Sequence, residues 1–149
     1  MDAAASAAEK GWTMGCGQYD ALVIPAAILA VVLLGVIVAF QLALAFGAPW
    51  GAAAWGGQSP GVLPARLRIA SGVVAVVVYP IVIALVLASA GLIDDGWLPA
   101  DRALIMWVLA GVLGVGALMN FASRSRPERT WGAIALTIAL CCVIVALGI

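Results

Sequence analysis

Four long apolar runs, separated by short segments that hold the polar and charged residues, dominate the pattern of this chain. An α-helix needs about 20 apolar residues to cross the hydrocarbon core of a bilayer. The runs therefore predict transmembrane helices over residues 21–46, 67–93, 102–121 and 127–149. Together they predict an all-α, four-transmembrane-helix integral membrane bundle in which residues 1–149 form a single membrane domain.

Polar residues and prolines suggest where these helices begin and bend. Asp20 and Asp101 each precede an apolar run and are expected to cap the first and third helices. Pro80 lies near the middle of the second helix, where it removes a backbone hydrogen bond and predicts a kink. Ser125 and Glu128 have the spacing of a capping box, which favours a structural role for this carboxylate over a catalytic one.

Composition supports the membrane assignment and excludes several functions. The chain is 66% apolar and 9% charged, whereas a soluble domain is about 25% charged. Its formal net charge is zero, so we expect no nucleic-acid partner. There is no histidine, and Cys16, Cys141 and Cys142 lack the spacing of a zinc site. We therefore expect no metal, no cofactor and no catalytic residue.

The basic residues are concentrated in two of the gaps between apolar runs. Five of the seven lie there, namely Arg66, Arg68, Arg124, Arg126 and Arg129. Because basic loops stay in the cytoplasm, we expect a bacterial cytoplasmic (inner) membrane protein with loops 47–66 and 122–126 cytoplasmic. Residues 1–20 would then form an outer segment, with both termini outside. The arginines are candidates for binding lipid headgroups or another anion, although topology alone can explain them.

The first cytoplasmic connection, residues 47–66, is rich in glycine, tryptophan and proline and is nearly uncharged. It is long for a helix connection in a small bundle. One interpretation is a folded cap, or a partly re-entrant element, over a cavity. The other is an interfacial loop that Trp50 and Trp55 anchor at the headgroup level.

A few polar residues fall within the apolar runs, mostly near the expected cytoplasmic ends. With the two tryptophans they make a candidate pocket of Gln41, Ser71, Tyr79, Asn120, Thr137, Trp50 and Trp55. The alternative is interhelical hydrogen bonding, worth about 0.6 kcal/mol per contact. No ionisable residue lies deep in the apolar runs, which argues against a carboxylate-based proton or sodium relay.

Small residues on the third and fourth predicted helices favour their close packing. Ala110 and Gly114 lie four residues apart on one helix, and Ala135 and Ala139 on the other. Such pairs allow helix backbones to approach one another in lipid.

Two stretches, residues 47–68 and 120–129, together resemble a family of small bacterial four-helix membrane proteins that usually have no assigned function. The resemblance implies a four-helix membrane protein. It implies no activity, so it assigns no catalytic role to any residue.

Three functional hypotheses follow. The first is a non-catalytic membrane protein that binds a lipid or small apolar ligand in its cytoplasmic half, or serves as an accessory subunit. Its partners would be membrane lipids and either further copies of the chain, in a homo-oligomer, or another membrane protein. The alternatives are a small oligomeric channel or transporter, and a lipid-modifying membrane enzyme in which Glu128 would be the only acid–base candidate.

Overall fold

The computed structural model describes residues 3–99 and 101–149, with side chains from residue 21 onward. This part of the chain is helical and contains no strand. Four helical spans are long and apolar enough to cross a membrane, Ala21–Ala45, Ala65–Ser89, Arg102–Ala122 and Arg126–Leu147. The predicted all-α bundle with four membrane-spanning helices is confirmed.

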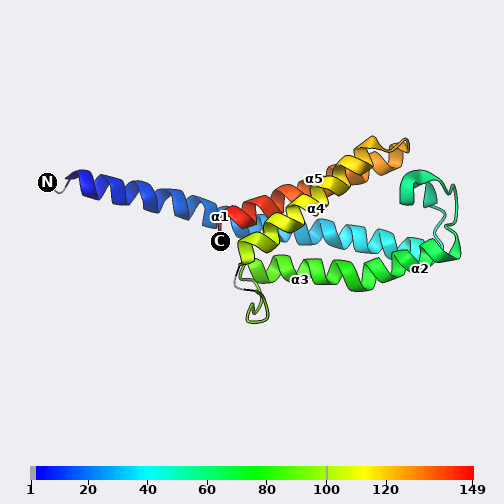
Figure 1. Ribbon diagram of the computed structural model, residues 1–149, viewed down its shortest axis with the longest axis horizontal. Coiled ribbons are helices and arrows are strands. Elements are labelled where there is room, and N and C mark those ends of the chain that lie inside the picture. The colour runs from blue at the N-terminus through cyan, green and yellow to red at the C-terminus, as the bar shows by residue number, and fades with distance from the viewer. Residues whose placement is uncertain (1–2, 100) are drawn as a thin grey trace.

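Helix α1 covers Ala3–Ala45 and is therefore longer than the first predicted span. The expectation that Asp20 begins this helix is wrong, because the helical backbone continues through it to Ala3. Five alanines among residues 3–8 favour helix at the start of the extension, since alanine has the highest helix propensity. Figure 1 shows the first part of α1 projecting beyond the bundle. The side chain of Cys16 lies outside the described residues.

The second span consists of α2 (Ala65–Val73), the π-helical turn η3 (Val74–Val78) and α3 (Tyr79–Ser89). The Tyr79 N–H donates to the carbonyl of Val74, five residues earlier. Pro80 follows directly and has no N–H to give. A π turn beside a proline relieves the contact between its ring and the preceding turn. The structure thus shows a π-helical turn next to Pro80, while the kink there stays a prediction.

The third and fourth spans are α4 (Arg102–Ala122) and α5 (Arg126–Leu147). Asp101 caps α4 as expected, because its carboxylate accepts a hydrogen bond from the Leu104 N–H at 2.9 Å. At the start of α5, Ser125 occupies the N-cap position but makes no capping hydrogen bond. The predicted capping box is therefore wrong.

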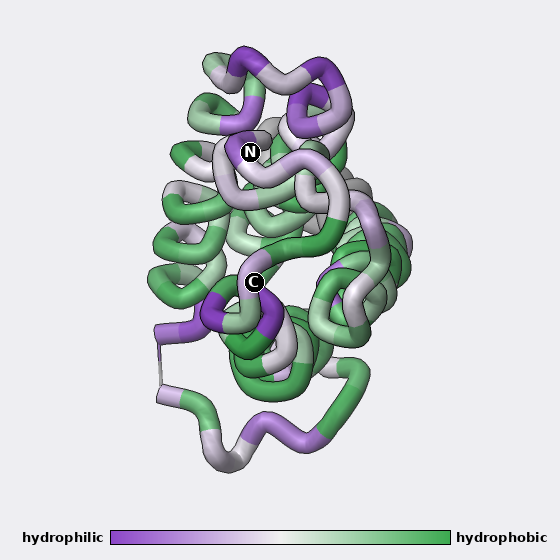
Figure 2. Tube along the Cα trace, turned by 90° about the vertical axis from the view of Figure 1, so that its right-hand side faces the viewer, coloured by the Kyte–Doolittle hydropathy of each residue, from purple (hydrophilic) through white to green (hydrophobic). Residues whose placement is uncertain are grey.

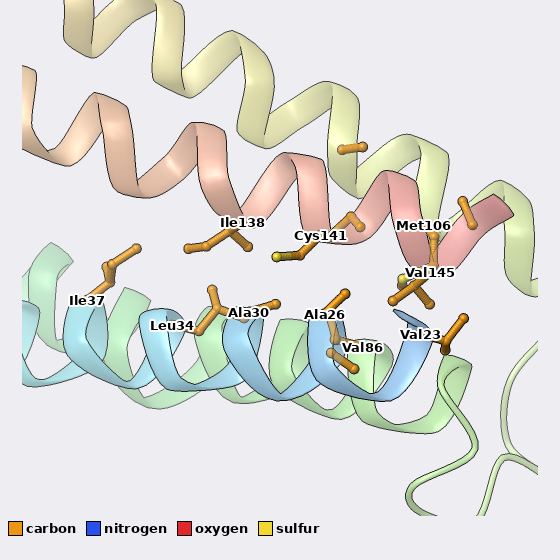
Figure 3. Packing of buried hydrophobic residues seen from close by; sticks show 14 residues of the cluster. Val23, Ala26, Ala30, Leu34, Ile37, Val86, Met106, Ile138, Cys141 and Val145 are labelled. Atoms are coloured by element: carbon orange, nitrogen blue, oxygen red, sulfur yellow. The ribbon is translucent and has the colours of Figure 1, made fainter. Parts of the chain in front are cut away.

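The helices form two antiparallel hairpins, α1 with α2–α3 and α4 with α5 (Figure 1). The hairpins join where α5 packs against α1, and α4 covers α5 from outside. Figure 3 shows Leu34 on α1 facing Ile138 on α5, with Val145, Met106 and Val86 in the same cluster. All five are fully buried. This cluster fills the half of the bundle near the start of α4.

The close packing predicted for α4 and α5 is confirmed. Ala117 and Ala135 are buried, and Gly132 lies so close to α4 that an added Cβ would come within 2.9 Å of the Phe121 ring. Gly111 and Gly114 do not take part, because a Cβ at either would meet nothing within 4 Å. The contact thus depends on the face of α4 that carries alanine rather than glycine.

The outer surface of the helices is apolar, as a bilayer requires. Leu22, Val32, Val76, Val112 and Leu118 are among the many large hydrophobic side chains that are exposed. Figure 2 shows hydrophobic residues along the helices and hydrophilic ones gathered in the connecting segments. We call the end of the bundle that holds residues 46–64 and 123–125 the basic end.

Candidate functional site

Residues 47–64 form a folded element, which we call the loop cap, at the basic end. It contains two short 3₁₀ turns, Gly51–Ala53 and Trp55–Gly57. Leu63 and Ala54 pack against Leu44 of α1. Gly51 donates its N–H to the Gly61 carbonyl at 2.8 Å, and an added Cβ would lie 2.3 Å from the Ser59 carbonyl oxygen. Only glycine fits there, which explains one role of the glycine-rich sequence.

The centre of the loop cap has an uncommon backbone conformation. Trp55, Gly56 and Gly57 have φ values of 54°, 82° and 66°. The left-handed conformation costs about 1–2 kcal/mol for a residue with a side chain, so Trp55 must be held by other contacts. One is the hydrogen bond from its indole Nε1 to the hydroxyl of Ser71 on α2, at 3.0 Å.

The Glu128 carboxylate provides the second contact and joins the loop cap to α5. Its Oε1 accepts a hydrogen bond from the Gly56 N–H at 2.7 Å, and its Oε2 accepts one from the Ser123 hydroxyl. Only 3% of Glu128 is exposed. The carboxylate therefore turns away from its own helix and binds the Gly56 N–H of the loop cap. This N–H has no other hydrogen-bond partner among the described residues. This contact replaces the predicted capping box.

Ser125 makes a parallel contact between the same two elements. Its hydroxyl donates to the Ala52 carbonyl at 2.5 Å, and its N–H donates to the Ser123 hydroxyl at 3.1 Å. Gly57 lies against it so tightly that an added Cβ would come within 2.6 Å of the Ser125 Cβ. The loop cap is thus docked on the turn between α4 and α5.

A cavity of about 400 Å³ lies beneath the loop cap, between the two hairpins. All four spans and the loop cap contribute to its wall. The lining residues are Ile37, Phe40, Gln41, Ala53, Ala54, Trp55, Val74, Tyr79, Val112, Leu113, Gly116, Asn120, Glu128, Trp131 and Ala135. Most are apolar or aromatic, and few carry a polar group, which is the usual make-up of a small-molecule site.

Four of the seven residues predicted for a pocket line this cavity, namely Gln41, Tyr79, Asn120 and Trp55. The amide of Gln41 lies beside the Tyr79 hydroxyl. The Oε1 atom of Gln41 is buried and accepts no hydrogen bond from any described residue. A buried acceptor without a donor costs about 1–3 kcal/mol, and reorientation of the neighbouring Tyr79 hydroxyl or of the amide itself supplies the missing bond.

The other three predicted residues lie elsewhere. Ser71 is buried behind the cavity wall, where it holds Trp55. The Thr137 hydroxyl donates to the Ala133 carbonyl of its own helix at 2.9 Å, so its placement in the pocket is wrong. Trp50 lines a second cavity of about 470 Å³, which adjoins the first and shares Phe40, Ala53 and Trp131 with it. Its ring stacks on Phe40, with centroids 6.2 Å apart.

Sequence reasoning did not place Phe40, Trp131 or Glu128 in the pocket, although it named Glu128 as the only acid–base candidate of the enzyme hypothesis. The rings of Phe40 and Trp131 lie 4.3 Å apart, centroid to centroid, and line both cavities. In the sequence they are ordinary members of apolar runs, so no local signal marks them. Glu128 did have a signal, because it is the one carboxylate in the two basic gaps. Its spacing from Ser125 favoured a capping box, so Glu128 was interpreted as a helix cap and not as a pocket residue.

The five predicted anion-binding arginines all lie at the basic end. Arg66, Arg124, Arg126 and Arg129 are exposed, whereas Arg68 is half-buried. The Arg68 Nε donates to the Ala45 carbonyl at 3.1 Å and satisfies an end carbonyl of α1. The Arg129 Nε donates to the Ser123 carbonyl, also at 3.1 Å. The structure thus gives two of these side chains a structural contact.

Glu128 has no basic partner within the described part of the chain. The one ion pair found there joins Arg102 to Asp95 at 2.5 Å, at the opposite end of the bundle. The residues described with side chains also contain no group of three or more acidic, cysteine or histidine residues that could hold a metal. What the cavity offers chemically is an apolar, aromatic enclosure with one carboxylate, that of Glu128, and the side-chain amides of Gln41 and Asn120.

Gly57→Ala should release the loop cap from the α4–α5 turn. Gly61→Ala is a matched control, because Gly61 also has a positive φ, of 89°, but a Cβ there meets nothing within 4 Å. Both variants bear the backbone cost, and only the first adds a clash, worth about 1–3 kcal/mol. We expect amide exchange in residues 51–57, followed by mass spectrometry, to become at least tenfold faster in Gly57→Ala than in Gly61→Ala. Equal rates in the two variants would refute the docking contact.

Comparisons with family models, curated proteins and solved structures found no match to this chain. The resemblance drawn from residues 47–68 and 120–129 therefore stays a prediction. The functional proposals that follow rest on the geometry of the chain itself.

Proposed function

We propose that this chain is a non-catalytic membrane protein that binds a small apolar or amphipathic molecule, such as a lipid chain, in the cavity beneath the loop cap. The observation that carries the proposal is the largely apolar cavity itself, which the loop cap and all four spans enclose and which the rings of Phe40, Tyr79 and Trp131 line. The volume of about 400 Å³ falls within the range of known ligand sites, roughly 300–1,000 Å³.

The cavity wall offers separate groups for the apolar part and the polar part of a ligand. Phe40, Tyr79 and Trp131 offer apolar surface, whereas Gln41 and Asn120 offer hydrogen bonds. Val112 of α4 lines the cavity and is 65% exposed, so we take the cavity to be open beside this residue. A molecule dissolved in the bilayer could therefore enter sideways past α4. The loop cap would close the cavity toward the basic end.

The structure gives less support to the channel and enzyme alternatives. A channel needs a continuous polar path, but the bundle beyond the cavity is filled by apolar side chains such as Leu34, Val86 and Ile138. An enzyme would use Glu128 as its acid–base group, and the residues that line the cavity include no second carboxylate and no histidine to act with it. We therefore favour binding over transport or catalysis.

We further propose that the basic end faces the cytoplasm of a bacterial cell. The exposed arginines there support this orientation, because basic residues are retained on the cytoplasmic side. In this orientation the cavity opens in the cytoplasmic half of the membrane, and the arginines lie at the level of anionic lipid headgroups.

Replacing Gly116 by leucine should fill the cavity and prevent binding. Gly116 lines the cavity, and a Cβ there meets nothing within 4 Å, so the added side chain occupies open space. Gly111→Leu is the control, because Gly111 is equally open but lies outside the cavity. A diazirine-bearing octanol, photoactivated with the purified protein in phosphatidylcholine nanodiscs, should label cavity residues in the wild type. We expect labelling to fall at least fivefold in Gly116→Leu only.

The labelled positions, mapped by mass spectrometry, decide the outcome. Labels on Tyr79, Asn120 or Glu128 that disappear in Gly116→Leu support the cavity as the site. The proposal would be overturned if labels appeared only on outward-facing residues, such as Val76 and Leu118, and did not change in either variant.

Orientation can be tested with single cysteines in a chain from which the native cysteines have been removed. Ser59→Cys lies in the loop cap and Gly96→Cys in the connection at the opposite end. In intact cells an impermeant maleimide should label Gly96→Cys and leave Ser59→Cys unlabelled, with the reverse in inverted vesicles. The opposite pattern would reverse the proposed topology.

A further inference from the structure

We propose that the cavity selects lipophilic cations, in particular organic ammonium compounds, and that the Glu128 carboxylate is the group that recognises them. This inference rests on the proposed binding function and names the chemical class of its ligand. It depends on three features of the cavity, which are an uncompensated carboxylate, a set of aromatic rings and an apolar wall at the exposed residue Val112.

The carboxylate is buried without a positive partner. Glu128 is 3% exposed, and its two observed donors, the Gly56 N–H and the Ser123 hydroxyl, are both neutral. A buried charge is normally paired with an opposite one, because removing it from water is costly. A carboxylate has about four lone-pair sites, so two observed bonds leave room for a further donor. Since Glu128 lines the cavity, a cationic ligand there would supply the missing charge.

Aromatic rings surround the same space. Phe40, Trp55, Tyr79 and Trp131 all line the cavity, and Phe40 and Trp131 are in direct contact. The face of an aromatic ring attracts a cation, most strongly for tryptophan, and a desolvated contact is worth about 2 kcal/mol. An ammonium group needs no strong hydrogen bond to benefit from such rings. The combination of rings and a carboxylate therefore favours a cation over a neutral molecule of the same shape.

The approach to the cavity determines which cations can reach it. The exposed arginines at the basic end repel small cations from the aqueous side, although salt screens this effect over about 8 Å. On the α4 side, where we propose that the cavity opens, the lining residues Val112 and Leu113 are apolar. A cation that carries an apolar body partitions into the bilayer and can enter there. Lipophilic ammonium compounds carry both a positive charge and an apolar body, so they can reach the cavity through the bilayer. Inorganic cations have no apolar body and do not partition into it.

Competition with the diazirine-bearing octanol tests this selectivity in the full-length chain. One competitor is (4-phenylbutyl)trimethylammonium, and the other is the neutral hydrocarbon in which a carbon atom replaces the nitrogen. Their relative potency is compared between the wild type and Glu128→Gln, in nanodiscs of zwitterionic phosphatidylcholine. Because both proteins lie in the same bilayer, differences in partitioning of the competitors cancel. Glutamine keeps an oxygen that can accept from the Gly56 N–H, so the loop cap stays in place.

For each protein we take the ratio of the potency of the ammonium compound to that of the hydrocarbon. We expect this ratio to be at least tenfold higher in the wild type than in Glu128→Gln. An unchanged ratio would overturn the inference and leave the proposed binding function intact. Absence of cavity labelling in the wild type would overturn both.

Trp131→Leu provides a second test that keeps the carboxylate and so covers the case in which Glu128→Gln fails to fold. It should weaken competition by the ammonium compound several-fold more than competition by the hydrocarbon. Equal weakening of the two would contradict a role for the ring in recognising charge.

Discussion

The hydrogen bond from the Gly56 N–H to the Glu128 carboxylate is the contact on which the basic end of this protein depends. It connects the first interhelical segment to the start of the last helix, across 72 positions of sequence. The two hairpins join through α1 and α5 near the opposite end, and the loop cap lies between them where they separate (Figure 1). Without this contact the left-handed turn at Trp55 would lose one of its two supports, and the cavity would lose its cover.

A buried carboxylate is an expensive means of fastening a loop in a membrane protein. Moving the charge out of water costs several kcal/mol, and each hydrogen bond to a charged group returns about 1.5–3 kcal/mol. Two such bonds, from Gly56 and Ser123, return about 3–6 kcal/mol, which is comparable to that cost but leaves the charge itself without an opposite one. The nearby arginines do not supply the opposite charge, since none pairs with Glu128 among the described residues. Under our proposal a cationic ligand completes the compensation, so that binding and closure of the loop cap stabilise each other.

The sequence predicted the features that depend on long-range averages of composition. The four apolar runs correspond to the four spans, and small residues correctly indicated the contact between α4 and α5. Features that depend on individual contacts were harder to predict. Glu128 has the spacing of a capping box, yet its helix leaves it free to bind the loop cap, which local sequence cannot reveal. Gln41 and Thr137 looked equivalent by depth, but the rotation of each helix turns only Gln41 toward the cavity.

The distance between the loop cap and the α4–α5 turn tests this account most directly. Nitroxide labels at Gln58 and Arg124, both exposed, can be introduced after replacing the native cysteines, and pulsed electron paramagnetic resonance then reports their separation. The account predicts one narrow, short distance distribution for the wild type and for Glu128→Gln, and a broad, longer one for Glu128→Ala. A distribution in Glu128→Ala identical to that of the wild type would show that the carboxylate does not hold the loop cap closed.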